Sequence, residues 1–264
     1  MPPACRLSGA EIARAAPTSS RPALAALAVI AVALPRPAHA MHLADGILPF
    51  GWAALWSVVA AAGVAVGLAR LRRRVSDDRR VRPLVALVAA LVFVLSCMPI
   101  PVPLVGTCSH PCGTGIAALL VGPWLTILVT VAALLLQALF LAHGGFTTLG
   151  ADVVSMGIAG AFVGWGTFHA LRRAGAPLGV SAFAAGLLSD WATYAVTSLE
   201  LATALHGARP LGVTALTIFA AFLPTQIPLG VLEGLLAAGA LSFLQRRRPD
   251  LLVRAGVVAA EDPA

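Results

Sequence analysis

Apolar segments of membrane-spanning length, separated by short breaks rich in proline, glycine and arginine, run through most of the chain. An α-helix needs about 20 apolar residues to cross a bilayer. The candidate spans are residues 48–70, 83–99, 113–122, 123–142, 151–171, 178–205 and 213–245, of which the third is short. Helices satisfy their own backbone hydrogen bonds in lipid, and the sequence lacks the alternation of a barrel strand. The pattern predicts an all-α, polytopic membrane protein with about seven transmembrane helices.

Arginine placement gives these spans an orientation. Basic residues gather in the segment Arg70–Arg82, in the pair Arg172-Arg173 and in the run Arg246–Arg248. Seven spans that start outside put all three groups on the cytoplasmic side, as the positive-inside rule requires. Residues 99–112, 143–150 and 206–210 then lie outside, and the C-terminus is cytoplasmic. We expect a multi-pass protein of the bacterial inner (cell) membrane.

Composition supports this prediction and excludes several function classes. The 264 residues are 59% hydrophobic and 11% charged, whereas soluble domains are about 25% charged. A net charge of +7 would suggest nucleic acid in a soluble protein, but here the arginines lie between spans. The chain has no lysine for a phosphate-binding loop, and neither H-E-x-x-H nor G-x-S-x-G occurs. We therefore expect no enzyme activity, no cofactor and no nucleic-acid partner.

The first forty residues resemble a targeting segment. A basic leader precedes an apolar run of twelve residues from Ala23 to Leu34, which is followed by a proline-rich break and Ala-His-Ala. A run this short, with an A-x-A site behind it, is typical of a cleavable signal peptide; the alternative is an uncleaved anchor helix. We predict a signal peptide over 1–40, a transmembrane metal-binding domain over 41–248 and a short, weakly structured cytoplasmic tail over 249–264.

Cleavage after Ala40 creates a metal chelate at the new N-terminus. The amine of Met41, together with the amide and imidazole nitrogens of His42, can surround one ion in a plane. His110 lies on the same side of the membrane, in the Pro/Gly-rich segment Met98–Gly115, and can supply a fourth nitrogen. Four nitrogens in a square plane suit Ni(II) or Cu(II) best. The alternative for any of these histidines is an ordinary hydrogen-bonded role at the membrane interface, which we assign to His143, His169 and His206.

Three stretches carry a resemblance to a known family: MHLADGILP, PVPLVGTCSHPCGTGIAALLVGPW and LLQALFLAHGGFTTLGADVVSMGIAGAFVG. Over most of residues 41–245 the chain resembles the CbiM/NikM family, the substrate-binding membrane components of energy-coupling-factor transporters for cobalt and nickel. The resemblance implies a seven-helix fold and metal ligation by Met41, His42 and His110. It also implies Co²⁺ or Ni²⁺ as the transported ligand and a link to cobalamin biosynthesis. The implied partners are a transmembrane coupling component, cytoplasmic ATPase subunits and a small auxiliary membrane subunit.

The residues around this chelate leave alternatives open. The sequence departs from the usual family pattern at Cys108 and Cys112, which can form a disulfide, supply a soft ligand or simply be small residues in a tight loop. Asp45 can orient the terminal segment or an imidazole, or serve as a turn residue with Gly46.

Acidic residues inside apolar segments suggest a rival function. Asp190, Glu200 and Glu233 interrupt candidate spans, and carboxylates are costly to bury in a bilayer. A proton-coupled secondary metal transporter would use them as relays, although the chain has no evident repeated halves. Glycine pairs spaced four apart, Gly63/Gly67 and Gly160/Gly164, permit close helix packing within the chain or against a partner.

Overall fold

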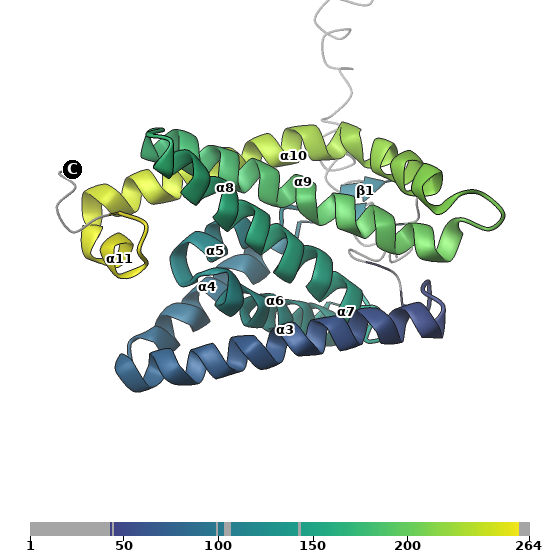
Figure 1. Cartoon of the computed structure of the whole chain (residues 1–264), viewed down its shortest axis with the longest axis horizontal. Helices are drawn as coiled ribbons and strands as arrows, with labels where there is room; N and C mark the ends of the chain where they lie inside the picture. The colour runs from purple at the N-terminus through teal and green to yellow at the C-terminus, as the bar shows by residue number, and fades with distance from the viewer. Residues whose placement is uncertain (1–42, 44, 99, 103–106, 142–143, 259–264) are drawn as a thin grey trace, which may run out of the picture. The chain divides into compact units, whose positions relative to one another are not determined.

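The computed structural model describes residues 43, 45–98, 100–102, 107–141 and 144–258. The leader, Met41 and His42 lie outside the described residues, so the signal peptide and the first two ligands stay predictions. The described chain is mostly helical (Figure 1). Its elements are α3 (Phe50–Asp77), α4 (Val81–Ser96), β1 (Ile100–Val102), β2 (Thr107–Ser109), α5 (Thr114–Val121), α6 (Pro123–Phe140), α7 (Leu149–Asp152), the π-helix η1 (Val153–Gly160), α8 (Ala161–Arg173), α9 (Leu178–Leu205), α10 (Leu211–Arg247) and α11 (Pro249–Arg254).

Four of the described helical segments are long and apolar enough to cross a membrane. They are α3, α6, the continuous run Leu149–Arg173 and α10, and α4 is a shorter apolar helix. The predicted short segment is α5, with eight residues. Gly122, at φ +85°, ends it, and Pro123 opens α6 at a position where a helix needs no N–H donor. The mostly helical fold agrees with the prediction, and within the predicted non-helical segment Met98–Gly115 two short strands form an antiparallel hairpin.

Helices α9 and α10 form the most extensive helix pair and run side by side in Figure 1. Glycines allow their close approach: a Cβ on Gly186 would lie 2.6 Å from the backbone oxygen of Glu233, and one on Gly234 would lie 2.7 Å from the ring of Phe183. Two prolines, Pro224 and Pro228, interrupt the hydrogen-bond ladder of α10. The pair therefore brings Glu233 close to α9 within the helix interface.

The two glycine motifs serve packing within the chain. A Cβ on Gly67 would lie 2.8 Å from the backbone oxygen of Trp124, and one on Gly63 would meet Ile158. Gly164 faces Ser189 and Ala185 of α9 in the same way. These contacts explain the small residues without a partner subunit.

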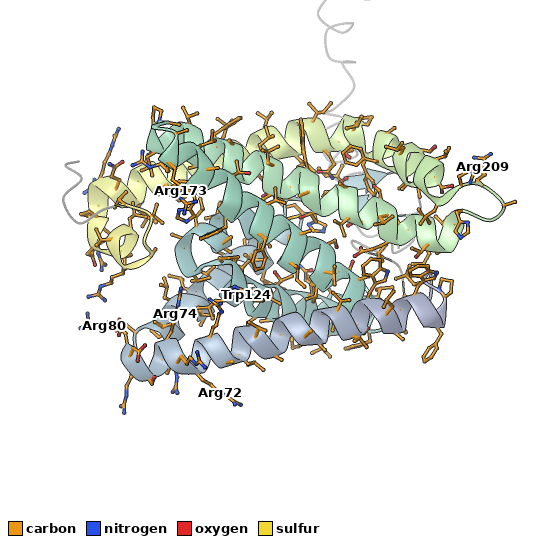
Figure 2. All side chains as sticks on the ribbon, in the orientation of Figure 1. Arg72, Arg74, Arg80, Trp124, Arg173 and Arg209 are labelled. Atoms are coloured by element: carbon orange, nitrogen blue, oxygen red, sulfur yellow. The ribbon has the colours of Figure 1, made fainter. Side chains whose placement is uncertain are left out.

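Arginine side chains gather at one end of the helices. Figure 2 shows Arg72, Arg74, Arg80 and Arg173 at the end near α11, and Arg209 at the other end. The sequence suggested a weakly structured tail beyond Arg248, but the structure gives residues 249–258 a defined fold. The segment forms α11, with Leu252 fully buried in a cluster with Phe168 and Leu241. The apolar side chains of this segment pack against residues that are distant in the sequence, so their burial could not be predicted from the local pattern.

Candidate functional site: a buried histidine–cysteine loop beside two carboxylates

The hairpin and the loop after it place the sequence-predicted ligands. Strands β1 and β2 pair Ile100 with Ser109 and Pro101 with Cys108. The chain then turns inward and enters α5 through Gly113, whose φ of +69° favours glycine. Residues 108–112 are all buried. The predicted irregular segment is therefore packed inside the protein.

His110 is held by the chain's single tyrosine. The His110 N–H donates to the Tyr194 hydroxyl oxygen at 2.8 Å, and that hydroxyl donates to the His110 carbonyl at 3.2 Å. The His110 ring Nδ1 lies 3.0 Å from the Pro111 carbonyl. A carbonyl only accepts, so this bond places a proton on Nδ1, and in the neutral ring Nε2 then carries the lone pair. This is the form of imidazole that ligates a metal ion.

Cys112, Asp190 and Glu233 meet directly behind His110. The N–H groups of Cys112 and Gly113 both donate to the Glu233 carboxylate, the second at 3.2 Å. The Cys112 Sγ lies 3.9 Å from both the His110 carbonyl and Asp190 Oδ1. Glu233 therefore fixes the start of α5, and the thiol lies between the loop and α9.

Gln226 connects Asp190 to the hairpin. With its amide nitrogen facing Asp190, Gln226 donates to Oδ2 at 2.8 Å and accepts from the Ser109 hydroxyl at 2.7 Å. This orientation satisfies all three groups, which a buried amide requires. Ser109 also lies 2.8 Å from the Thr225 hydroxyl. The polar network thus spans the loop, α9 and α10.

The chain directly after His42 is docked by a second set of contacts. Leu43 is fully buried; its N–H donates to Asp152 Oδ1 at 3.4 Å, and its carbonyl accepts from Thr148 at 2.9 Å. Asp45 is exposed and accepts from both the hydroxyl and the N–H of Thr147. The side-chain bond from Thr147, followed by the backbone bond, lowers the pKa of Asp45 below its usual 3.8. Asp45 therefore ties the terminal segment to the loop before α7.

The structure separates the remaining candidates. Cys108 and Cys112 are both buried, and their sulfurs are not joined in a disulfide. Burial raises the pKa of the Cys108 thiol. Glu200 is fully buried, with Asp152 and Ser155 near its carboxylate. It does not join the pair Asp190 and Glu233.

Sequence reasoning missed Tyr194, Gln226 and Asp152. Each is a buried polar residue within an apolar helix, which is a usable signal because such groups need partners. Tyr194 was also conspicuous as the only tyrosine. The sequence does not reveal the hydrogen-bond partner of each residue, because the partners depend on how the helices, α9 and α10 among them, pack together.

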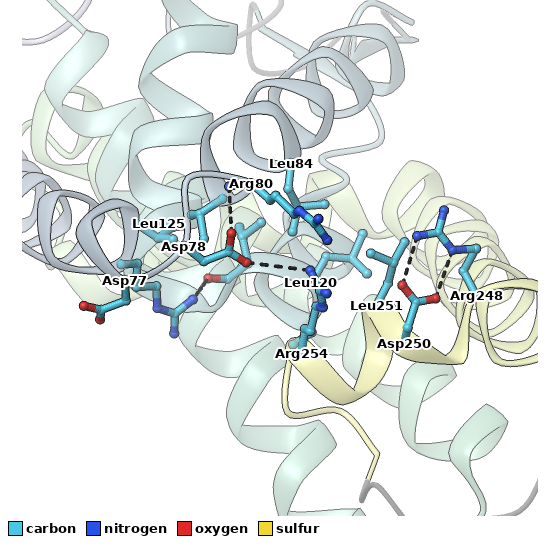
Figure 3. A pocket seen from close by; sticks show the side chains of 14 residues that line it. Asp77, Asp78, Arg80, Leu84, Leu120, Leu125, Arg248, Asp250, Leu251 and Arg254 are labelled. Carbon is cyan, nitrogen blue, oxygen red and sulfur yellow. Dashed lines mark hydrogen bonds and ion pairs between the residues drawn. The ribbon is translucent and has the colours of Figure 1, made fainter.

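A cavity of about 380 Å³ lies at the arginine-rich end, where α11 meets the α3–α4 turn. Figure 3 shows its charged lining: Arg248 pairs with Asp250 at 2.9 Å, and Arg254 lies 3.7 Å from Asp78. The residues that line it include none of the candidate metal ligands.

The described helices that are long and apolar enough to cross a membrane define the class of the chain, a multi-pass helical membrane protein. The family comparison is more specific. Residues 42–251 match the model of the CbiM family, described as the cobalt uptake substrate-specific transmembrane region. The chain belongs to this family.

Individual relatives agree with the family match. A cobalt transport protein CbiM of Sorangium cellulosum is 61% identical over 218 residues, which are 83% of this chain and 97% of that protein. The CbiM of Geobacter sulfurreducens is 60% identical over 233 residues, 88% of this chain and 67% of that protein. A crystal structure of a truncated transition metal transporter has a TM-score of 0.69 at 24% identity, covering 78% of this chain and 99% of the other. This last likeness supports the fold.

Proposed function

We propose that this chain captures Co²⁺ or Ni²⁺ from the outer compartment as the substrate-binding subunit of an ATP-driven energy-coupling-factor transporter. The observation that carries the proposal is the state of His110. Tyr194 holds its peptide and Nδ1 is bonded to the Pro111 carbonyl, so in the neutral ring Nε2 is the nitrogen that would ligate a metal. The description of the matching family, cobalt uptake, supports a transition-metal ion as the ligand of this imidazole.

The other ligands of the proposed site are the amine of Met41 and the amide and imidazole of His42. The contacts at Leu43 support this assignment, because they fix the residue next to His42. Leu43, Cys112 and Tyr194 belong to one apolar core, so the docked terminal segment and the His110 loop share a packing unit. The family match begins at residue 42, which is consistent with a leader removed after Ala40.

The proposed topology has seven spans, with the new N-terminus outside and the C-terminus in the cytoplasm. The one-sided arginines in Figure 2 support it through the positive-inside rule. Energy then comes from partners, a transmembrane coupling component and cytoplasmic ATPase subunits, with a small auxiliary membrane subunit, because the chain has no lysine for a phosphate loop of its own.

Metal retention by purified variants tests the capture site. His42→Ala and His110→Ala should each remove one high-affinity equivalent of bound Co²⁺ or Ni²⁺. His206→Ala, at the end of α9, is the matched control and should bind as the parent does. Retention of that equivalent by either ligand variant contradicts the proposed site.

Uptake in cells tests the coupling. Transport should require the ATPase partners and continue after the proton gradient is collapsed while ATP is maintained. Loss of uptake on gradient collapse alone would favour the rival, a proton-coupled transporter that uses Asp190, Glu200 and Glu233. The separation of Glu200 from the other two carboxylates disfavours a continuous relay among the three.

A further inference from the structure

Cys112, Asp190 and Glu233 bring three metal-ligating side chains together from the loop before α5, from α9 and from α10. One ligand atom of each lies within 4.8 Å of the other two. All three residues are buried, with exposed fractions of 0%, 0% and 1%. They are separated by more than 40 residues along the chain, so their meeting is a product of the fold.

The hydrogen bonds around this cluster hold its metal-ligating side chains in place and leave lone pairs with which they can bind a cation. Glu233 accepts from the N–H groups of Cys112 and Gly113, and Asp190 accepts from Gln226. A carboxylate has about four lone-pair sites, so each retains acceptor capacity. Among the described residues, neither carboxylate forms an ion pair with an arginine. Two neighbouring acids in an apolar interior favour a cation between them.

The spacing and chemistry of the cluster fit a transition metal. Sulfur and oxygen ligands lie about 2.0–2.3 Å from such an ion, so tetrahedral neighbours lie about 3.5 Å apart. Side-chain movements on the order of 1 Å would bring the three ligand atoms from their present spacing to that of a tetrahedral site. A thiolate with two carboxylates selects a borderline transition metal over Mg²⁺ or Ca²⁺, which prefer all-oxygen ligands.

We infer that Cys112, Asp190 and Glu233 form a second, internal binding site for a divalent transition-metal ion such as Co²⁺. Cys112 is two residues past His110, and Asp190 is one helical turn from Tyr194, which holds His110. The inferred site is therefore next to the His110 loop. The site itself does not depend on capture by Met41 and His42, and the two are tested separately.

Co²⁺ titration of the purified full chain in detergent tests this inference, because a thiolate bound to Co²⁺ gives a charge-transfer absorption in the near ultraviolet that nitrogen and oxygen ligands do not. The parent should develop this band with one Co²⁺ equivalent, and His110→Ala should keep it. Cys112→Ser should lose the band, whereas Cys108→Ser, a matched change in the same loop, should retain it. Asp190→Asn keeps the thiol and the side-chain shape, and it should lower the affinity for the Co²⁺ ion that gives the band at least tenfold.

Two results would overturn the inference: no charge-transfer band in the parent, or a band that survives Cys112→Ser. If Cys112→Ser unfolds, a parent-like affinity in folded Asp190→Asn overturns it as well. A different result would contradict the proposed capture function: His110→Ala would still bind an equivalent of metal with high affinity and without a thiolate band. The melting temperature of each variant establishes that it is folded.

Discussion

Tyr194→Phe is the most informative change in the protein, because it removes one oxygen atom and little else. That hydroxyl accepts from the His110 N–H at 2.8 Å and donates to the His110 carbonyl at 3.2 Å. The ring keeps its packing against Phe222, whose centroid lies 5.0 Å away. The substitution therefore isolates the role of the hydrogen bonds that hold the His110 peptide.

The expected cost follows from the buried N–H that loses its acceptor. An unsatisfied buried donor costs about 1–3 kcal/mol. If the loop must be held in place for His110 to ligate, this free energy appears in metal binding. Since 1.4 kcal/mol is tenfold in affinity, the Kd for Co²⁺ should rise roughly 5- to 150-fold.

Equilibrium Co²⁺ binding to purified protein, measured together with the melting temperature, checks this expectation. Ser198→Ala is the matched control, one helical turn along α9. Its hydroxyl donates only to the Tyr194 backbone oxygen at 2.7 Å, so its loss leaves no orphaned donor. A Tyr194→Phe protein that binds Co²⁺ within about twofold of the Ser198→Ala protein would refute the proposal that Tyr194 positions His110.

Three further predictions concern packing and docking. Gly67→Ala should destabilise the protein by about 1–3 kcal/mol, because the new Cβ meets the Trp124 backbone at 2.8 Å; thermal unfolding should show no such loss for Gly166→Ala, where the space is open. Leu252→Ala should destabilise α11 by about 2–5 kcal/mol and expose the C-terminal segment to protease, whereas Val253→Ala, at an exposed position, should not; equal cleavage of the two would contradict the packing assigned to α11. Because the pKa of Asp45 is lowered in the fold, its stabilising contribution should be complete above the ordinary pKa of 3.8 and disappear as the pH falls through the lowered value. The difference in melting temperature between the parent and Asp45→Asn should therefore shrink in acid, and a difference that grows would contradict this account.

Much of the helical pattern is predictable from the sequence, because bilayer length and breakers are local signals. The break at Gly122-Pro123 and the short helix before it illustrate this: a positive-φ glycine followed by proline ends one helix and starts another. The hairpin was not predictable, since β1 and β2 are three residues each and one contains Pro101. Their pairing depends on packing against α10.

The candidate site was predictable in its residue types and not in its geometry. His110 and Cys112 stand out in a Pro/Gly-rich segment, and Asp190 and Glu233 stand out in apolar helices. The register of α9 against α10 decides which carboxylates lie beside the His110 loop. Gly186 and Gly234 permit this register because they let the two helices approach closely. The same register leaves Glu200 beside Asp152. No local pattern in the sequence contains this information.

Native mass spectrometry of the membrane-purified protein with one equivalent of Co²⁺ tests the central claim most directly, because it reports the N-terminus and the bound ion together. The account predicts a chain that begins at Met41 and carries one Co²⁺, since the amine created by cleavage is itself a ligand. A Cys112→Ser chain, which lacks the internal site, that retains its leader or starts at Ala40 or Leu43 and still binds Co²⁺ with equal occupancy would contradict it.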